Sequence, residues 1–180
     1  MFEQNVGENV FLRDEQALRQ HSRDLLSHET GRRDNALAVD LLQSVLAAEI
    51  ICVMRYTLLA ISEEGLKNQR IATEFQAQAN DERRHMTLLA QRIEALGGTP
   101  EFSPAGLSSR ISALSRGDAS LAVRLWQNLA AEQCVVDHYR ELIAFFEPHD
   151  PETAEILKEI LQDEEDHTGD MQDLLVSYAG

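Results

Sequence analysis

Proline and glycine are scarce in this sequence, which holds four prolines and nine glycines in 180 residues. The prolines occur at only two places, Pro100 with Pro104 and Pro148 with Pro151, so long segments contain no helix-breaking residue. Those segments are rich in Leu, Ala, Glu, Gln and Arg, which favour helices. Pairs of alternating β-branched runs with hairpin turns between them are also missing. The composition therefore predicts an all-α fold.

Cysteine is nearly absent as well, with Cys52 and Cys134 the two in the chain. Two cysteines outside a CxxC pattern build neither a disulfide framework nor a thiolate metal site, so we expect both as small buried residues in a reducing cytoplasm. The most apolar stretch, Val39–Ile61, contains polar and charged side chains, and the N-terminus lacks the layout of a leader. We therefore expect neither a signal peptide nor a membrane span.

Positive charge is in short supply. The 16 Lys and Arg residues face 31 Asp and Glu residues, which leaves a net charge of −15. The arginines before residue 35 are interleaved with acids and form no basic arm. Such a surface repels phosphate backbones and attracts cations, so we expect no nucleic-acid partner.

Four long helices are predicted from apolar residues spaced three and four apart. They cover about residues 34–62, 68–96 and 118–146, and a fourth opens at Asp150-Pro151 and carries its apolar stripe to Tyr178. The pair Gly97-Gly98 should end the second helix. Residues 11–29 show only a weak stripe, which is typical of a short helix outside a bundle.

The connections predict the topology. Short turns near Glu64-Gly65 and Pro148-His149 should make two antiparallel hairpins. The link over residues 99–117 is far longer, and a chain of that length can reach roughly 60 Å when extended. We therefore predict an antiparallel four-helix bundle with one long crossover between the second and third helices. Residues 1–36 are expected as a partly helical N-terminal extension and residues 37–180 as the bundle.

Each predicted core stripe contains a glutamate in place of an apolar residue. On two of the helices the glutamate belongs to a Glu-x-x-His pair, which places an imidazole one turn further along the same face. A single pair of this kind is weak support for a metal site, but four acids near the middle of four helices are not a chance pattern. The inward residues are Glu49, Glu82, His85, Glu132, Glu164 and His167.

Charge then indicates what these residues bind. Burying unpaired carboxylates costs several kcal/mol, and no Lys or Arg shares the four stripes. Two divalent cations would balance four carboxylates. Oxygen and nitrogen ligands without thiolate suit iron, and manganese fits the same set. The six residues are therefore predicted to hold two Fe ions.

Other polar and aromatic residues receive plainer interpretations. Asp81 and Asp163 each precede a motif glutamate and are predicted to hydrogen-bond the ligand imidazoles. Tyr56 and Tyr139 lie two turns after a glutamate, either as core aromatics or as partners of the site. Phe75 and Trp126 are interpreted as core or interface residues. The remaining histidines lack a repeating partner and are expected at the surface; they are His21, His28, His138 and His149.

The order of these motifs resembles bacterioferritin over roughly residues 37–178. The matching segments are residues 48–56, 65–67, 81–85, Glu132 with 139–141, and 161–167. The resemblance implies a ferritin-like di-iron site in which Glu82 and Glu164 bridge two Fe ions. It also implies that Glu49 with His85 completes one iron site, and Glu132 with His167 the other.

Three departures from bacterioferritin change the expectation. The position of its haem-binding methionine is Arg83 here, so haem is not expected. Its fifth helix has no counterpart, because the chain stops at Gly180, and the first 33 or so residues are extra. These two features resemble Dps-like miniferritins, a subgroup of which keeps the bacterioferritin-type site in a shell of twelve subunits. The number of subunits stays open between this shell, one of twenty-four and a smaller assembly.

The predicted function is a cytoplasmic ferroxidase and iron-storage or detoxification protein, built as a homo-oligomeric shell. Fe(II) and either O2 or H2O2 would be its small-molecule partners. Two alternatives stay open: peroxide protection of the Dps type without bulk storage, and a di-iron oxidase acting on an organic substrate. A helical interaction module without metal is the non-catalytic alternative.

Overall fold

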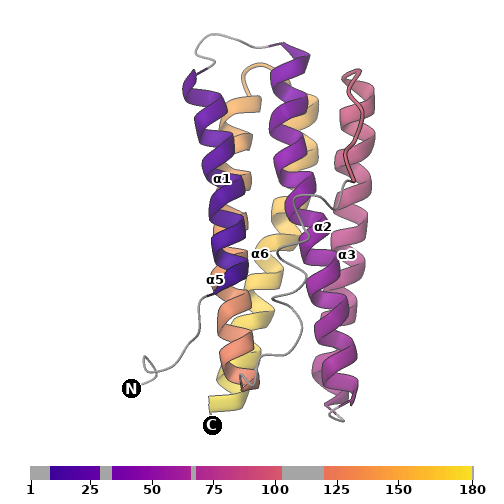
Figure 1. Ribbon diagram of the computed structural model, residues 1–180, viewed down its shortest axis with the longest axis vertical. Coiled ribbons are helices and arrows are strands. Elements are labelled where there is room, and N and C mark those ends of the chain that lie inside the picture. The colour runs from indigo at the N-terminus through magenta and orange to yellow at the C-terminus, as the bar shows by residue number, and fades with distance from the viewer. Residues whose placement is uncertain (1–8, 29–33, 66–67, 103–119, 180) are drawn as a thin grey trace. The chain divides into compact units, whose positions relative to one another are not determined.

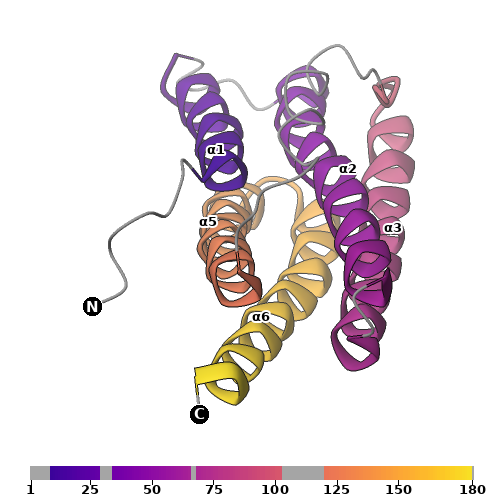
Figure 2. The same cartoon turned by 60° about the horizontal axis from the view of Figure 1, so that its bottom comes forward.

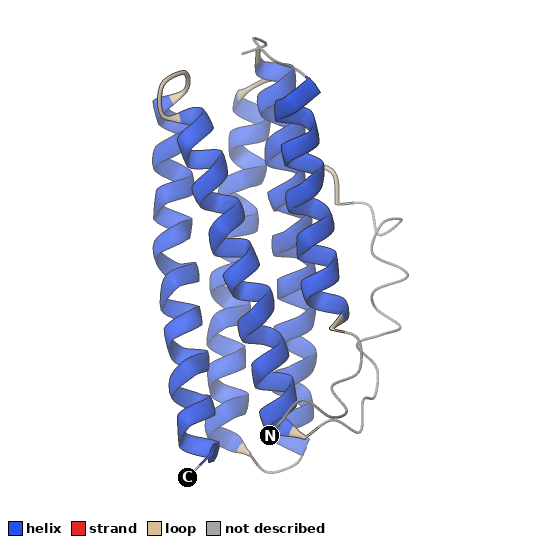
Figure 3. Cartoon of the chain, turned by 90° about the vertical axis from the view of Figure 1, so that its left-hand side faces the viewer, coloured by secondary structure: helices blue, strands red, loops and turns tan. Residues whose placement is uncertain are grey.

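The computed structural model describes residues 9–28, 34–65, 68–102 and 120–179, and all regular structure within these ranges is α-helical (Figures 1 and 3). The predicted all-α class is confirmed. Predicted and observed helix ends differ by about one turn or less. The described helices are α1 (Val10–His28), α2 (Asn35–Gly65), α3 (Gln69–Ala95), α5 (Leu121–Phe146) and α6 (Pro151–Ala179).

The chain divides into two compact units. One comprises Met1–Gln20 and Ser115–Gly180 and contains α5 and α6, and the other comprises His21–Leu114 and contains α2 and α3. We call them the α5–α6 unit and the α2–α3 unit. Helix α1 is divided between them after Gln20.

In the α2–α3 unit, the two helices form an antiparallel hairpin. The side-chain amide of Asn35, at the start of α2, donates to the Leu96 carbonyl just beyond α3 at 3.1 Å. At the opposite end the Asn68 backbone N–H donates to the Glu63 carbonyl at 2.9 Å. Figures 1 and 2 both show α2 and α3 side by side along their length. The short turn predicted near Glu64-Gly65 therefore joins antiparallel neighbours.

The predicted apolar stripes form the core of this hairpin. Burial of apolar side chains from water supplies most of the free energy that holds such helices together. On α3 every predicted stripe residue is fully buried, and on α2 Val53 and Leu59, the alternative to Ala60, are half-buried. The buried stripe residues are Leu42, Leu46, Tyr56 and Ala60 on α2, and Ile71, Phe75, Ala79, Leu89 and Ile93 on α3.

Helix α3 ends at the predicted Gly97-Gly98 pair. The Gly98 N–H donates to the Ile93 carbonyl and the Gly97 N–H to the Glu94 carbonyl, both at 2.9 Å, which is the Schellman arrangement. Gly97 has φ +86°, a conformation that glycine adopts readily and other residues rarely. A Cβ on Gly98 would lie 2.8 Å from both methyl groups of Val39 on α2. The turn therefore depends on both glycines.

In the α5–α6 unit, the second hairpin begins and ends with ordinary caps. The Ser120 hydroxyl accepts from the Val123 N–H, and the Asp150 carboxylate accepts from the Thr153 N–H, so both side chains satisfy N-terminal donors. Lys158 forms an ion pair with Glu147 at 2.8 Å across the turn. The hairpin buries most of the predicted stripe, with Leu121 half-buried and the Tyr178 side chain outside the described residues. The buried members are Leu125, Val135, Tyr139, Leu142 and Phe146 on α5, and Leu157, Ile160, Met171 and Leu174 on α6.

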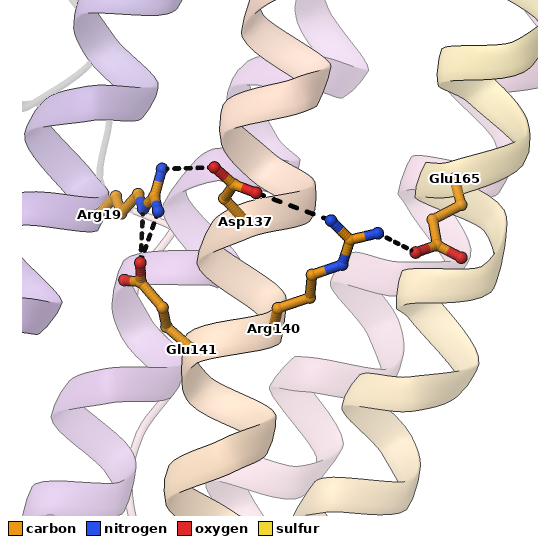
Figure 4. Close-up of polar contacts among 5 residues, drawn as sticks. All are labelled: Arg19, Asp137, Arg140, Glu141 and Glu165. Atoms are coloured by element: carbon orange, nitrogen blue, oxygen red, sulfur yellow. Dashed lines mark hydrogen bonds and ion pairs between the residues drawn. The ribbon is translucent and has the colours of Figure 1, made fainter.

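Polar contacts hold α1 in place. Its first half lies along α5 within the α5–α6 unit, where Arg19 donates to Glu141 at 3.1 Å and pairs with Asp137 at 3.0 Å. Figure 4 shows the pairing continuing through Arg140 to Glu165 on α6, at 2.6 Å. The hydrogen bond to Glu141 raises the pKa of Arg19, so this guanidinium stays charged. The helix predicted over residues 11–29 is thus observed over Val10–His28, and ion pairs from Arg19 join its first half to α5.

Two expectations meet the structure only in part. The predicted crossover over residues 99–117 lies mostly outside the described residues. By length and composition alone, α2 is apolar enough to cross a membrane, which the sequence reasoning did not expect. Most of that stretch, 61%, is buried inside the protein, as the core helix of a bundle would be.

We predict that Gly97→Ala lowers the free energy of unfolding by about 1 kcal/mol, because alanine is strained at positive φ. Gly65→Ala is the matched control, since a Cβ there would have no atom within 4 Å. Urea denaturation monitored by circular dichroism measures both variants. Equal stability of the two variants would show that the α3 turn does not need glycine.

Candidate metal centre

The α2–α3 unit buries two glutamates and a histidine against each other. Glu49 comes from α2 and lies on the stripe of Leu42 and Leu46, while Glu82 and His85 lie one turn apart on α3. The three side chains are at most 1% exposed. His85 Nδ1 is 3.4 Å from a Glu49 oxygen and 3.2 Å from a Glu82 oxygen. We call these residues the α2–α3 cluster.

The α5–α6 unit repeats this arrangement. Glu132 comes from α5, and Glu164 and His167 lie one turn apart on α6. These side chains are at most 3% exposed, and His167 Nδ1 is 3.5 Å from a Glu164 oxygen. We call these residues the α5–α6 cluster. All six residues singled out in the sequence are therefore buried, three in each unit.

Both clusters have a geometry that could hold a metal ion. Within each, one ligand atom per residue lies within 4.8 Å of the others. In both Glu-x-x-His pairs the nitrogen facing the carboxylate is Nδ1. Two carboxylate oxygens and an imidazole nitrogen converging on one point suit an oxygen- and nitrogen-preferring ion such as iron or manganese. Neither cluster contains a thiolate.

Because Nδ1 is the histidine nitrogen that faces the carboxylates, it affects the predicted roles of Asp81 and Asp163. If Nδ1 of each histidine binds metal, Nε2 is the nitrogen left for a second partner. Both aspartates are half-buried, one turn before their histidine. The hydrogen bonds of these aspartates to the imidazoles stay a prediction.

Helix α2 also holds a buried cation, Arg55, that was not predicted from the sequence. Arg55 is fully buried, although the sequence suggested only an interruption of an apolar stretch. Its guanidinium donates to the Tyr56 hydroxyl at 3.1 Å and lies 4.7 Å from that ring's centroid. Tyr56 in turn stacks on Phe75, with centroids 5.8 Å apart. Tyr56 is therefore both a core aromatic and a polar partner.

Two buried carboxamides were also missed as candidates. Gln78 on α3 and Asn128 on α5 are each 1% exposed. Each lies one turn before a cluster glutamate, Glu82 and Glu132 respectively. The available signal was a polar residue four positions before each glutamate.

The surface expectation was wrong for one histidine. His138 is 2% exposed, because it shares the buried side of α5 with Val135 and Leu142, whereas His21, His28 and His149 are exposed as predicted. Trp126 is 51% exposed in this chain, so it is not a core residue, and its interface interpretation stays a prediction.

The cysteines behave as predicted. Cys52 and Cys134 are both buried and free. Burial, reinforced by the Glu15 carboxylate, raises the pKa of the Cys134 thiol, while the hydrogen bond with Arg19 opposes the shift. A protonated thiol is a poor nucleophile and a poor metal ligand, so Cys134 has a packing role.

Comparison with known proteins agrees with this geometry. Residues 39–179 match the family described as Ferritin-like domain. A relative from Pyrococcus furiosus, named DNA protection during starvation protein, is 30% identical over 142 residues, which is 76% of this chain and 76% of the relative. The matched region contains both hairpins with their buried carboxylates and imidazoles. The chain therefore belongs to the ferritin-like family.

Proposed function

We propose that this protein oxidises Fe(II) with O2 or H2O2 and sequesters the ferric product. The observation that carries the proposal is the pair of clusters, each with two buried carboxylates beside a histidine Nδ1. Family membership supports iron storage or peroxide protection in general. The ferroxidase chemistry and its residues are the finer step proposed here.

Charge supports a divalent cation as the occupant of each cluster. Glu49 and Glu82 carry two negative charges when ionised, and a neutral His85 adds none. One Fe(II) therefore brings the α2–α3 cluster to neutrality, and the same arithmetic holds for the α5–α6 cluster. Without a cation, each pair of carboxylates would repel in a medium of low dielectric constant.

The two clusters are proposed to form one di-iron centre within a four-helix bundle in each subunit. In this arrangement Glu82 and Glu164 would be the ligands shared by the two irons, as the resemblance to bacterioferritin implies. Glu49 with His85 and Glu132 with His167 complete the separate coordination of each iron. An oxidant that binds there can take one electron from each Fe(II), which is how a paired site performs two-electron chemistry.

Iron storage and peroxide protection are two roles that the same Fe(II) oxidation could serve. The Pyrococcus furiosus relative bears a name that refers to DNA protection, which favours protection as the second candidate function. Consumption of peroxide together with Fe(II) would protect DNA without contact, and contact is disfavoured by the net charge of −15. We propose a cytoplasmic homo-oligomeric shell as the form in which either role operates.

Metal binding predicts a rise in stability. Manganese(II), a redox-silent substitute for Fe(II), should raise Tm, because at one hundred times Kd a bound ligand adds about 2.7 kcal/mol. Glu82→Gln should abolish that rise, and its metal-free form should be no less stable than the wild type, since one buried charge is removed. Glu94→Gln, an exposed acid on α3, is the control. An unchanged Tm at saturating manganese would argue against both clusters.

Fe(II) oxidation predicts a ferric absorbance that depends on both hairpins. Glu49→Gln and Glu132→Gln each remove one ligand from one cluster, and each should slow oxidation on the order of 100-fold, at least the loss typical of an outer partner of a metal ligand. Stopped-flow absorbance with air-saturated Fe(II) measures the rates, again with Glu94→Gln as the control.

Four outcomes are informative, two from the oxidation rates and two from the iron load and size of the particle. Wild-type rates no faster than buffer would reject the ferroxidase. If peroxide outcompetes O2, protection is favoured, and a large ferric load per particle, sized by light scattering, favours storage. A monomer at all iron loads would contradict the shell.

A further inference from the structure

The buried carboxamide of Gln78 lies next to the α2–α3 cluster. On α3 the buried face runs from Phe75 through Gln78 and Ala79 to Glu82 and His85. Residues four apart on a helix lie one above the other, so Gln78 shares the face of Glu82. The side chain is 1% exposed. Gln78 therefore occupies a core position directly beside proposed iron ligands.

Neither polar atom of this amide has a hydrogen-bond partner among the described residues. Oε1 and Nε2 are both fully buried without a partner. Flipping the amide, which exchanges these two atoms, would therefore leave both without a hydrogen bond. Burying an amide without hydrogen bonds lowers stability, and a leucine or methionine at this position would avoid that cost. The polarity of Gln78 therefore does not stabilise the core. A role in binding a ligand would explain why a polar residue is present here.

The chemistry of the amide restricts the ligand. A carboxamide carries no charge, donates two hydrogen bonds and accepts two. The fitting ligand is small, neutral and hydroxylic, able to donate and accept at once; hydrogen peroxide and water meet this description. Dioxygen donates no hydrogen bond, and a ferrous ion prefers the carboxylates one turn away.

We propose that Gln78 binds hydrogen peroxide beside the α2–α3 cluster and thereby makes the site favour peroxide over dioxygen. This inference rests on the proposed ferroxidase function and identifies the oxidant that its site selects. In the reaction, two Fe(II) ions each lose one electron, the O–O bond of hydrogen peroxide breaks, and two protons are taken up to give two water molecules. The amide takes no part in electron transfer and acts as a binding residue.

The α5–α6 unit offers a similar group. Asn128 is 1% exposed, lies one turn before Glu132, and its Oδ1 has no hydrogen-bond partner among the described residues. A buried amide one turn before a cluster glutamate thus occurs in both units. A single buried polar residue could be tolerated by chance, but the same placement in both units is harder to explain in that way.

The test compares oxidants in a variant that removes only the hydrogen bonds. Gln78→Met keeps the length and approximate volume of the side chain and removes a buried polar group, so the protein should fold. Stopped-flow absorbance gives the Fe(II) oxidation rate with hydrogen peroxide under anaerobic conditions and with dioxygen alone. We expect the ratio of the peroxide rate to the dioxygen rate to fall about tenfold, the size expected from losing hydrogen bonds to a buried ligand. Gln78→Leu serves as a second apolar variant.

Two controls separate a binding role from a structural one. Gln91→Met changes an exposed glutamine of the same helix and should leave the ratio unaltered. The manganese-induced rise in Tm should persist in Gln78→Met, because the cluster ligands are untouched. If the rise disappears, Gln78 shapes the cluster and the peroxide proposal is wrong.

The remaining outcomes also decide. An unaltered ratio in both apolar variants, with active wild-type protein, would overturn the peroxide role and leave the ferroxidase proposal standing; equal slowing with both oxidants would indicate that Gln78 holds only a water molecule. Wild-type protein inert toward Fe(II) with both oxidants would instead reject the underlying function.

Discussion

Buried carboxylates need a positive partner, and this requirement governs the middle of both helix hairpins. Glu49 and Glu82 in one unit, and Glu132 and Glu164 in the other, are at most 1% exposed. A neutral histidine beside each pair supplies a ligand nitrogen without balancing the charge. A divalent cation does both, because it neutralises two carboxylates and accepts the imidazole lone pair. The helices around these positions can then be ordinary, with caps at their ends and apolar stripes along their length.

Each hairpin buries two carboxylates and an imidazole, on two helices that a short turn joins. The first helix contributes one glutamate and the second contributes Glu-x-x-His, so the spacing along two antiparallel helices suffices to bring three groups together. This duplication suits two-electron chemistry on a pair of irons. The buried amides of Gln78 and Asn128 extend the same pattern by one turn and give each unit a neutral polar group beside its charged one.

Helical period was sufficient to predict the fold class, the two hairpins and all six cluster residues from sequence. Acids on an apolar stripe are a strong signal, because a buried carboxylate needs a compensating partner and no Lys or Arg shares the four predicted stripes. The burial of His138 and Arg55 was not predicted. His138 lies on the buried side of α5 with Val135 and Leu142, but a lone histidine was expected at the surface. Arg55 is buried with its guanidinium on the Tyr56 hydroxyl, a contact that the helical period does not reveal. The extent of α1 was predicted to within one residue at each end, but its ion pairs, such as Arg19 with Glu141, could not be predicted from a weak apolar stripe.

The most direct test is anomalous diffraction at the iron edge from crystals grown anaerobically with Fe(II). If bound cations compensate the buried carboxylates, we expect two anomalous peaks per subunit. One should lie beside Glu49 and His85 and the other beside Glu132 and His167, with Glu82 and Glu164 as shared ligands. Crystals without anomalous density at these positions, or with the six side chains directed toward solvent, would contradict this expectation.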